Sequence, residues 1–296
     1  MAILATSNLA LPQHIADGMF TQATEGSSVA ALSGQKPMLF GETSFFTFNL
    51  GEAEFVGEGQ QKSATDFTSD VKTVKPYKAQ ITVRYNEEVK WADEDYQLHV
   101  LADLAGQTAP KLARALDFGV MHGISPLQGT VWQGFTEYLS QTENTITAGD
   151  SKIADMDAAE ALILDAGAEV TGMAIDPKYA VGFRSMRDEA GRRLYPEFTP
   201  SVTPSNLDGF RVSVNNTVSA AGVADADTGI QAFVGDWSSI YWGVQKRVGV
   251  HLIEYGDPDG QGDLQRNNQI ALRAEVVYGW AFRNVNRFAK IAAAAA

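Results

Sequence analysis

The sequence contains no cysteine among its 296 residues. This absence excludes disulfide bridges and thiolate zinc sites. Basic residues are also scarce, because 23 lysines and arginines stand against 36 acids and leave a formal net charge of -13. Proteins that bind nucleic-acid phosphates for affinity are usually basic, so that class of protein is disfavoured. An acidic surface would instead repel DNA lying near it.

Long apolar runs are missing as well. No stretch of about 18 apolar residues occurs, so no membrane-spanning helix is expected. The first residues lack the basic flank and the long apolar core of a signal peptide. These absences predict a soluble cytoplasmic protein. The chain is nevertheless 45% hydrophobic and 10% aromatic, which is enough for a substantial core in one or two domains.

The chain is organised around residues 93–123, which the pattern predicts as one long helix. Apolar residues recur there at steps of three and four, and acids crowd its start. Pro110 lies inside the pattern and is expected to kink or split the helix. The apolar stripe consists of Leu98, Leu101, Ala105, Thr108, Leu112, Leu116 and Val120.

Two strands are predicted ahead of that helix, over residues 45–56 and 67–87, with a polar, glycine-rich tip at 57–66. An isolated two-stranded hairpin is barely stable in water, so this hairpin needs a partner surface. That surface could belong to another molecule or to the hairpin's own domain, and the sequence leaves both alternatives open.

The rest of the chain predicts a mixture of few helices and long strands, which is the α+β class. A loop with three prolines is expected at 194–208. Helices are expected at 12–32, 155–167 and 177–190. Strands are expected at 145–147, 170–175, 210–214, 233–241, 244–255 and 270–291.

Two clusters could hold a metal ion, and each has a simpler explanation. Asp95, His99 and Asp103 lie four residues apart on one predicted helix face, although a solvated polar face accounts for them better. The second cluster resembles a calcium loop, but its twelfth position is Asn268, where an EF-hand needs a bidentate glutamate. A turn rich in aspartate and glycine explains that cluster better. Its members are Asp257, Asp259, Gln261 and Asp263.

A family resemblance emerges from the order of several short motifs. Gly51-Glu-Ala-Glu-Phe-Val-Gly-Glu-Gly59 is followed by Lys62, by a lysine-dotted strand ending in Glu87-Glu88, and by the long helix. Later motifs agree, among them Met173-Ala-Ile-Asp-Pro177, Gly209-Phe-Arg-Val-Ser-Val and Gly235-Asp236-Trp-Ser. Together they resemble the major capsid proteins of tailed bacteriophages, which have the Hong Kong 97-type fold.

The resemblance implies a division of the chain into named parts. These are an N-terminal arm and helix at 1–36, an extended-loop hairpin at 37–90, a peripheral domain with a spine helix at 91–150 and 240–280, and an axial domain at 151–239 and 281–296. The extended loop is implied to lie over a neighbouring subunit. The residues expected to make inter-subunit contacts there are Glu54, Phe55, Glu58, Gln60, Lys62, Asp66 and Lys72.

The implied function is self-assembly, through pentamers and hexamers, into the icosahedral head shell of a virion around double-stranded DNA. The DNA would be enclosed without sequence-specific binding, and the protein would be made in the host bacterial cytoplasm with no membrane partner. Portal and decoration proteins are implied partners. The arm begins at residue 1 and leaves no room for a built-in scaffolding domain, so a separate scaffolding protein, or none, is expected.

No enzymatic activity, cofactor or metal is expected, because no nucleophile–base pair or metal set is apparent. Covalent crosslinks between subunits are not expected either, since Lys62 lies in a polar tip where its amine would be exposed and charged. Two other functions stay open: an encapsulin, which is a bacterial compartment of the same fold that encloses enzymes, and an enzyme on an unrelated α+β fold. The long hairpin and free arm favour the phage shell.

Overall fold

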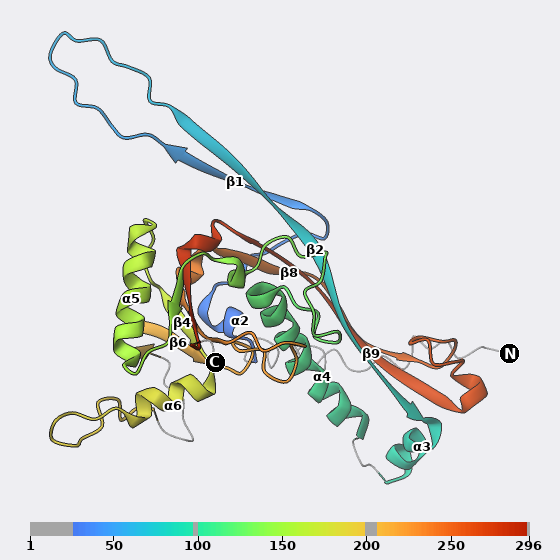
Figure 1. Ribbon diagram of the computed structural model, residues 1–296. Coiled ribbons are helices and arrows are strands. Elements are labelled where there is room, and N and C mark those ends of the chain that lie inside the picture. Colours follow the sequence, from blue (N-terminus) through green and yellow to red (C-terminus); the bar gives the residue numbers. More distant parts are fainter. Residues whose placement is uncertain (1–25, 97–99, 199–205, 295–296) are drawn as a thin grey trace.

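Two β-sheets, of four and six strands, organise the molecule, and a hairpin projects from its body (Figure 1). This computed structural model describes residues 26–96, 100–198 and 206–294. Helices pack against both sheets, so the α+β class predicted from the sequence is confirmed. None of the helices in these described ranges combines the length and the apolar character that a bilayer crossing requires.

The four-stranded sheet contains the longest strands, in the order β1-β2-β9-β8. Strand β2, Phe67–Asn86, pairs through its second half with β9, Gln269–Phe282. Strand β8, Ile240–Ile253, pairs with the other side of β9. Strand β1, Thr43–Leu50, pairs with the first half of β2, beyond the part that β9 covers. The strand predicted at 67–87 is therefore confirmed.

The six-stranded sheet has the order β3-β10-β7-β4-β6-β5. Its short central strands are almost fully buried, as expected for strands covered on both faces. The strands predicted at 145–147 and 210–214 are confirmed, and the former pairs here with β10 although it was expected in the part that contains the long helix. The strands are β3 (Thr145–Thr147), β10 (Phe288–Ala292), β7 (Ile230–Gly235), β4 (Gly172–Ile175), β6 (Phe210–Val214) and β5 (Asn206–Leu207).

The prediction of one strand at 270–291 is wrong. Strand β9 ends at Phe282, and the 3₁₀ turn η6, Val285–Arg287, leads into β10 of the other sheet. The side chain of Asn284 accepts a hydrogen bond from the backbone N–H of Asn286 at 2.9 Å. Such local bonds compete with a strand and favour a turn, which explains the break.

The prediction of one strand at 233–241 is wrong for the same kind of reason. The chain leaves β7 at Gly235, passes through the 3₁₀ turn η4, Trp237–Ser239, and enters β8 in the other sheet. The Asp236 carboxylate accepts from the backbone N–H of Ser238 at 3.1 Å and caps this turn. The chain thus passes from one sheet to the other at each of these two capped turns.

The long helix predicted at 93–123 is two described helices and a π-helical turn. Helix α3, Glu87–Tyr96, begins directly after β2, and α4, Val100–Asp117, runs through Pro110 without ending there. The π-helix η2, Phe118–His122, follows, and Gly123 ends it with a left-handed φ of 65°. Thr108, Leu112, Leu116 and Val120 of the predicted stripe are buried, whereas Leu98, Leu101 and Ala105 lie outside the described side chains.

Helices α5, Lys152–Asp165, and α6, Pro177–Ser185, pack on the six-stranded sheet. Helix α5 begins three residues earlier than predicted because Ser151 caps it, accepting a hydrogen bond from Ala154 N–H. Helix α6 starts at its proline but ends five residues before the predicted end. The chain turns into a short loop there, closed by a hydrogen bond from Leu194 N–H to the carbonyl of Met186.

A buried carboxylate attaches the short helix α2, Ser28–Leu32, to the end of α4. Asp117 is fully buried, and no basic residue contacts it among the described hydrogen bonds and ion pairs. An anion is favourable there because the first N–H groups of a helix point at it. Burial raises the pKa of Asp117, and its hydrogen bonds oppose that effect. The donors are the backbone N–H groups of Ser28 and Val29 and the hydroxyls of Ser27 and Thr217.

His122 is the last residue of the π-helix η2, which directly follows Asp117, and it is also buried. Its Nε2 atom lies 3.1 Å from the backbone carbonyl oxygen of Thr217, which fits a neutral ring with its hydrogen on Nε2. Burial lowers the pKa of His122 to about 4. Thr217 therefore contacts both Asp117 and His122. We call the cluster of Asp117, His122 and Thr217 the junction, because it joins α2, α4 and the loop after β6. Of the helix predicted at 12–32, residues 12–25 lie outside the described part.

Candidate inter-subunit surface

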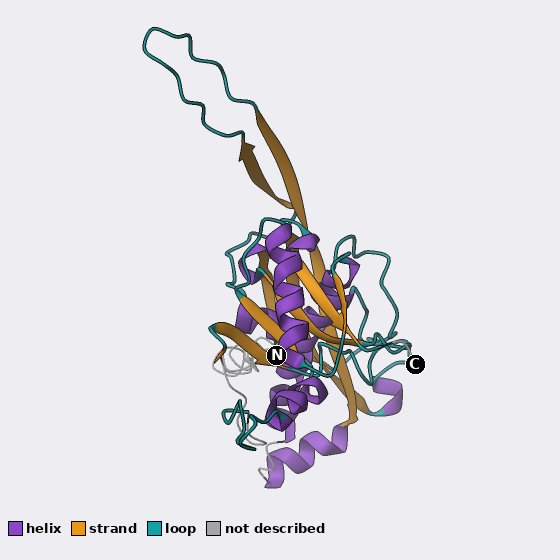
Figure 2. Ribbon diagram, turned by 60° about the vertical axis from the view of Figure 1, so that its left-hand side comes forward, coloured by secondary structure: helices purple, strands orange, loops and turns teal. Residues whose placement is uncertain are grey.

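The β1–β2 hairpin extends away from the body of the molecule in both views (Figure 1, Figure 2). Its two strands pair in regular antiparallel register from Thr43 with Val74 to Leu50 with Phe67. Residues 51–66 beyond them form an open loop without strand pairing. The predicted first strand, 45–56, is therefore too long by six residues at its end.

One face of this hairpin is apolar and exposed. Paired residues of an antiparallel ribbon project from the same face, and successive residues alternate between faces. The pairs Phe46 with Val71 and Leu50 with Phe67 thus lie on one face, together with Phe48. These five side chains are 48–74% exposed. We call them the apolar stripe of the hairpin: Phe46, Phe48, Leu50, Phe67 and Val71.

The base of the hairpin is fixed to the body through its other face. Phe45 stacks on Tyr241, with ring centroids 5.0 Å apart. Val74 is fully buried beside Met38. The Lys72 ammonium group donates to the Glu137 carboxylate at 3.1 Å. The hairpin is therefore anchored at one end, while its stripe and loop face solvent.

Six of the seven residues expected to contact a neighbour lie in the open loop, and all six are exposed. They are Glu54, Phe55, Glu58, Gln60, Lys62 and Asp66. Lys72 differs, because its charged group is bound to Glu137 within the same chain. The polar tip was predicted at 57–66. The early end of β1 extends the loop back to residue 51 and adds Phe55 to it, and that side chain is completely exposed.

The loop holds its shape through few internal contacts. The Glu54 carboxylate accepts a hydrogen bond from the backbone N–H of Ser63 at 2.9 Å. Hydrogen bonding by the Ser63 side chain, and secondly by this backbone N–H, lowers the pKa of Glu54. A tight turn is closed by a bond from Gln60 N–H to the carbonyl of Gly57. These contacts bury no apolar surface, so the loop gains almost no stability from its own chain.

The apolar stripe is the feature that the site prediction missed. The alternation in Phe46-Thr-Phe48-Asn-Leu50 was visible as a strand pattern, but none of these side chains was among the predicted contact residues. The sequence does not say which face of a strand pair is covered. Only the register, together with the direction in which the hairpin leaves the body, places these side chains in solvent.

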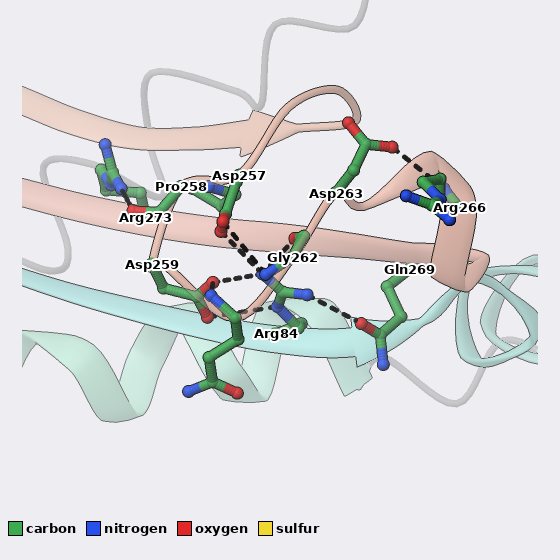
Figure 3. Close-up of polar contacts among 10 residues, drawn as sticks. Arg84, Asp257, Pro258, Asp259, Gly262, Asp263, Arg266, Gln269 and Arg273 are labelled. Carbon is green, nitrogen blue, oxygen red and sulfur yellow. Dashed lines mark hydrogen bonds and ion pairs between the residues drawn. The ribbon is translucent and has the colours of Figure 1, made fainter.

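The suspected calcium loop holds a guanidinium group instead of a metal ion (Figure 3). Arg84 of β2 reaches into it and donates from Nε to Asp259 at 3.1 Å, from Nη2 to the same carboxylate, and from Nη2 to Asp257 at 3.4 Å. Arg84 lowers the pKa of Asp259. Asp263 points elsewhere and caps Arg266 N–H. The acids of this turn thus bind a cation that the chain itself supplies.

The members of the other suspected metal cluster, His99 and the side chains of Asp95 and Asp103, lie outside the described residues. Within the described part, no group of three or more metal-ligating side chains comes together. The hairpin is therefore the feature with the clearest functional chemistry.

Comparison with known proteins gives a consistent result. The family model described as "Phage capsid family" matches residues 8–293. A solved structure from Mycobacterium phage Ogopogo is 34% identical, with a TM-score of 0.80 over 99% of this chain and 100% of that one. One from Gordonia phage Cozz is 28% identical, with a TM-score of 0.77 over 91% of this chain and 87% of that one.

A more distant structure, the capsid of an empty GTA particle, is 17% identical, with a TM-score of 0.61 over 91% of this chain and 90% of that one, and shows the shared fold alone. None of the curated proteins compared with the sequence matches it. The family model and the Ogopogo structure each span nearly the whole chain, as the motifs in the sequence led us to expect. The chain belongs to the phage capsid family and is a major capsid protein of a phage head shell.

Proposed function

We propose that the hairpin joins neighbouring copies of this chain in the icosahedral head shell of a tailed phage that encloses double-stranded DNA. The exposed apolar stripe is the single observation that carries this role. Contiguous apolar surface on a ribbon with no core of its own marks an interaction site. In the proposed shell, the stripe and the loop of one subunit lie over its neighbour.

The energy available from this contact is considerable. Burying a large apolar side chain contributes about 1.5–3 kcal/mol, so five such residues supply on the order of 10 kcal/mol before the costs of association. The same contact recurs at every subunit. Many repeated contacts of moderate strength close a robust particle.

The finer assignments follow from this role. We propose the arm at 1–36, the extended loop at 37–90, the peripheral domain at 91–150 and 240–280, and the axial domain at 151–239 and 281–296. Pentamers and hexamers form the shell, which is assembled in the host bacterial cytoplasm. The proposed partners are a portal and a decoration protein, with either a separate scaffolding protein or none.

Charge supports an enclosing role rather than a binding one. The net charge of -13 disfavours adhesion of packaged DNA to the wall and needs no sequence-specific contact. The proposed role is structural and not catalytic, in keeping with the apolar character of the hairpin surface.

Electron microscopy of the expressed protein tests this function. We expect hollow closed shells from the wild type and unassembled subunits or rings from the triple variant Phe46→Ser, Phe48→Ser, Phe67→Ser. A matched triple variant on exposed apolar residues of the body, Leu164→Ser, Val181→Ser and Leu194→Ser, should still close shells. Normal shells from the hairpin variant would contradict the proposal. Particles from infected cells that contain enzymes instead of DNA would indicate the compartment function.

A further inference from the structure

A groove of about 560 Å³ lies between α4, the second half of β2 and the loop at 124–135. Aromatic rings form its apolar part, with Tyr77 and Trp280 at 4.3 Å between centroids and Trp132 and Phe135 at 4.8 Å. Leu127 at its border is almost completely exposed. The groove is therefore suited to an apolar side chain that arrives from outside.

The groove also runs along an unpaired strand edge. Residues 75–86 of β2 pair with β9 on one side, and no strand among the described residues pairs with their other side. An open edge of this kind accepts an extended segment through backbone hydrogen bonds, while neighbouring pockets select its side chains. The groove therefore fits an extended segment with a large apolar residue.

The charge of the groove is opposite to that of the whole chain. Every charged residue that lines it is a cation, namely Lys78, Lys111 and Arg114. Lys78 is paired with Glu275 at 2.7 Å, whereas Lys111 is exposed at the border. A segment that carries both acids and an apolar anchor would match this lining.

The open loop of the hairpin contains such a segment. Residues 51–58 include three glutamates around Phe55 and Val56, and all of them are exposed. They form no strand pairing within their own chain. The groove lies on the body of the chain, between α4 and the second half of β2. Figure 1 shows the loop of the same chain extending away from that body, so a second copy must supply the groove.

We propose that residues 51–58 of one copy occupy this groove on a second copy, with Phe55 against the aromatic cluster and the glutamates beside Lys111 and Arg114. This inference rests on the proposed function and adds the acceptor surface to it. The extended segment lies along the open edge of β2 in the second copy.

Disulfide trapping tests the placement cleanly, because the chain has no cysteine. The double variant Val56→Cys, Leu127→Cys keeps Phe55 and places one thiol on the loop and the other at the groove. Assembled under reducing conditions and then oxidised, it should give dimers and higher multiples on a non-reducing gel. The matched control Val56→Cys, Leu164→Cys places the second thiol on α5, away from the groove, and should stay monomeric on that gel.

The outcomes separate this inference from the function on which it rests. Closed shells without multiples, or equal multiples from the control pair, would overturn the groove and leave the shell function intact. Absence of shells from the wild type, both when it is expressed alone and when it is expressed with the proposed scaffolding protein, would overturn the function itself. A further double variant combines Leu127→Cys with a cysteine within residues 1–25. If its two thiols form a disulfide without increasing the mass on the gel, the bond lies within one chain. The groove would then belong to the chain's own N-terminal segment, and this result would also overturn the proposal.

A charge-reversal cycle gives a second readout in the shell assay. Lys111→Glu alone and the loop variant Glu52→Lys, Glu54→Lys alone should each lower the yield of closed shells several-fold. Their combination should recover part of that yield, because opposite charges face each other again. Lys178→Glu, an exposed lysine on α6, is the matched control and should not be rescued by the loop variant. A combination no better than either parent would contradict the charge pairing.

Discussion

The hairpin and the junction around Asp117 differ in which kind of side chain they expose to water and which kind they bury. The hairpin leaves five apolar side chains in water, whereas the junction removes a carboxylate and an imidazole from it. Each arrangement is costly unless something compensates it. At the junction, hydrogen bonds from the same chain supply the compensation. At the hairpin nothing in the described chain does so, and the proposed contact with a second copy would supply the compensation.

This difference separates changes that affect assembly from changes that affect folding. Variants of the hairpin should alter shell formation and leave the subunit stable. Variants of the junction or of the core should alter the stability of the subunit itself. The predictions below test that separation from the largest expected effect to the smallest.

Removal of the open loop should have the largest effect. Replacement of residues 51–66 with a two-residue Asn-Gly turn connects Leu50 to Phe67, which are already paired across the two strands, and so keeps the strand register. Closed shells should be lost, while the free energy of unfolding of the subunit stays within about 1 kcal/mol of wild type, because the loop buries no core. Electron microscopy and chemical denaturation measure the two effects. If the shortened protein unfolds, the loop contributes to the fold of the subunit. If it forms normal shells, the loop does not serve assembly. Either result would contradict the distinction between the two regions.

Two phenylalanines in the same sheet should separate folding from assembly. Phe282 is fully buried in β9, so Phe282→Ala should lower the free energy of unfolding by about 3–5 kcal/mol. Phe48→Ala on the exposed stripe should change it by no more than about 0.5 kcal/mol and should instead reduce shell yield. Equal losses of stability in the two variants would mean that the stripe is packed within its own subunit.

Much of the fold was predictable because local patterns and tertiary structure agree. The alternation in 67–87 identified β2, and the helical spacing of Leu112, Leu116 and Val120 identified the buried side of α4 and η2. The sheet changes at η4 and η6 were missed, since periodicity does not tell which sheet a strand joins. The cation for Asp257 was missed because Arg84 lies far away in the sequence.

The candidate site was predicted in part for a related reason. The glycine-rich loop is visible as a polar composition, so its place between two strands could be inferred. The stripe consists of ordinary strand residues, and their exposure depends on the absence of a covering element. A sequence contains no local sign of such an absence.

Acid should weaken the junction through His122. The folded pKa of about 4 lies below the unfolded value of 6.5, so stability is full above pH 6.5 and is lost as the pH falls towards 4. The loss amounts to about 3 kcal/mol. Denaturation curves between pH 7.5 and 4 should therefore fall more steeply for the wild type than for His122→Gln.

The comparison with His122→Gln isolates this group from Asp117. The raised pKa of Asp117 acts in the opposite direction, because its carboxyl group binds a proton more readily in the folded state as the pH falls. Both proteins retain Asp117, so its contribution cancels between them. The exposed His251→Gln should behave like the wild type, and an identical pH dependence in all three proteins would contradict the assignment.

Asp117→Asn should cost a smaller amount, about 2 kcal/mol. Each carboxylate oxygen accepts from one backbone N–H, of Ser28 or of Val29. An amide in either orientation therefore turns its NH₂ group towards one of these donors. Asp165→Asn, on an exposed residue at the end of α5, is the control and should change stability by less than about 0.5 kcal/mol. Unchanged stability of Asp117→Asn would mean that the carboxylate does not hold α2.

The last comparison concerns the lysines of the hairpin and predicts no change. A covalent link to a neighbouring asparagine would need an uncharged amine with a free lone pair. Lys62 is exposed in the open loop, and Lys72 is engaged as an ammonium group with Glu137. We therefore expect Lys62→Arg and Lys72→Arg to give the same denaturing-gel pattern as the wild type, with monomers alone from mature particles. A ladder of multiples from the wild type that one substitution abolishes would show that assembly changes the surroundings of that lysine. In that case the hairpin would join neighbouring subunits through a covalent bond as well as through apolar contacts. Its variants would then have to be separated into those that affect packing and those that affect crosslinking.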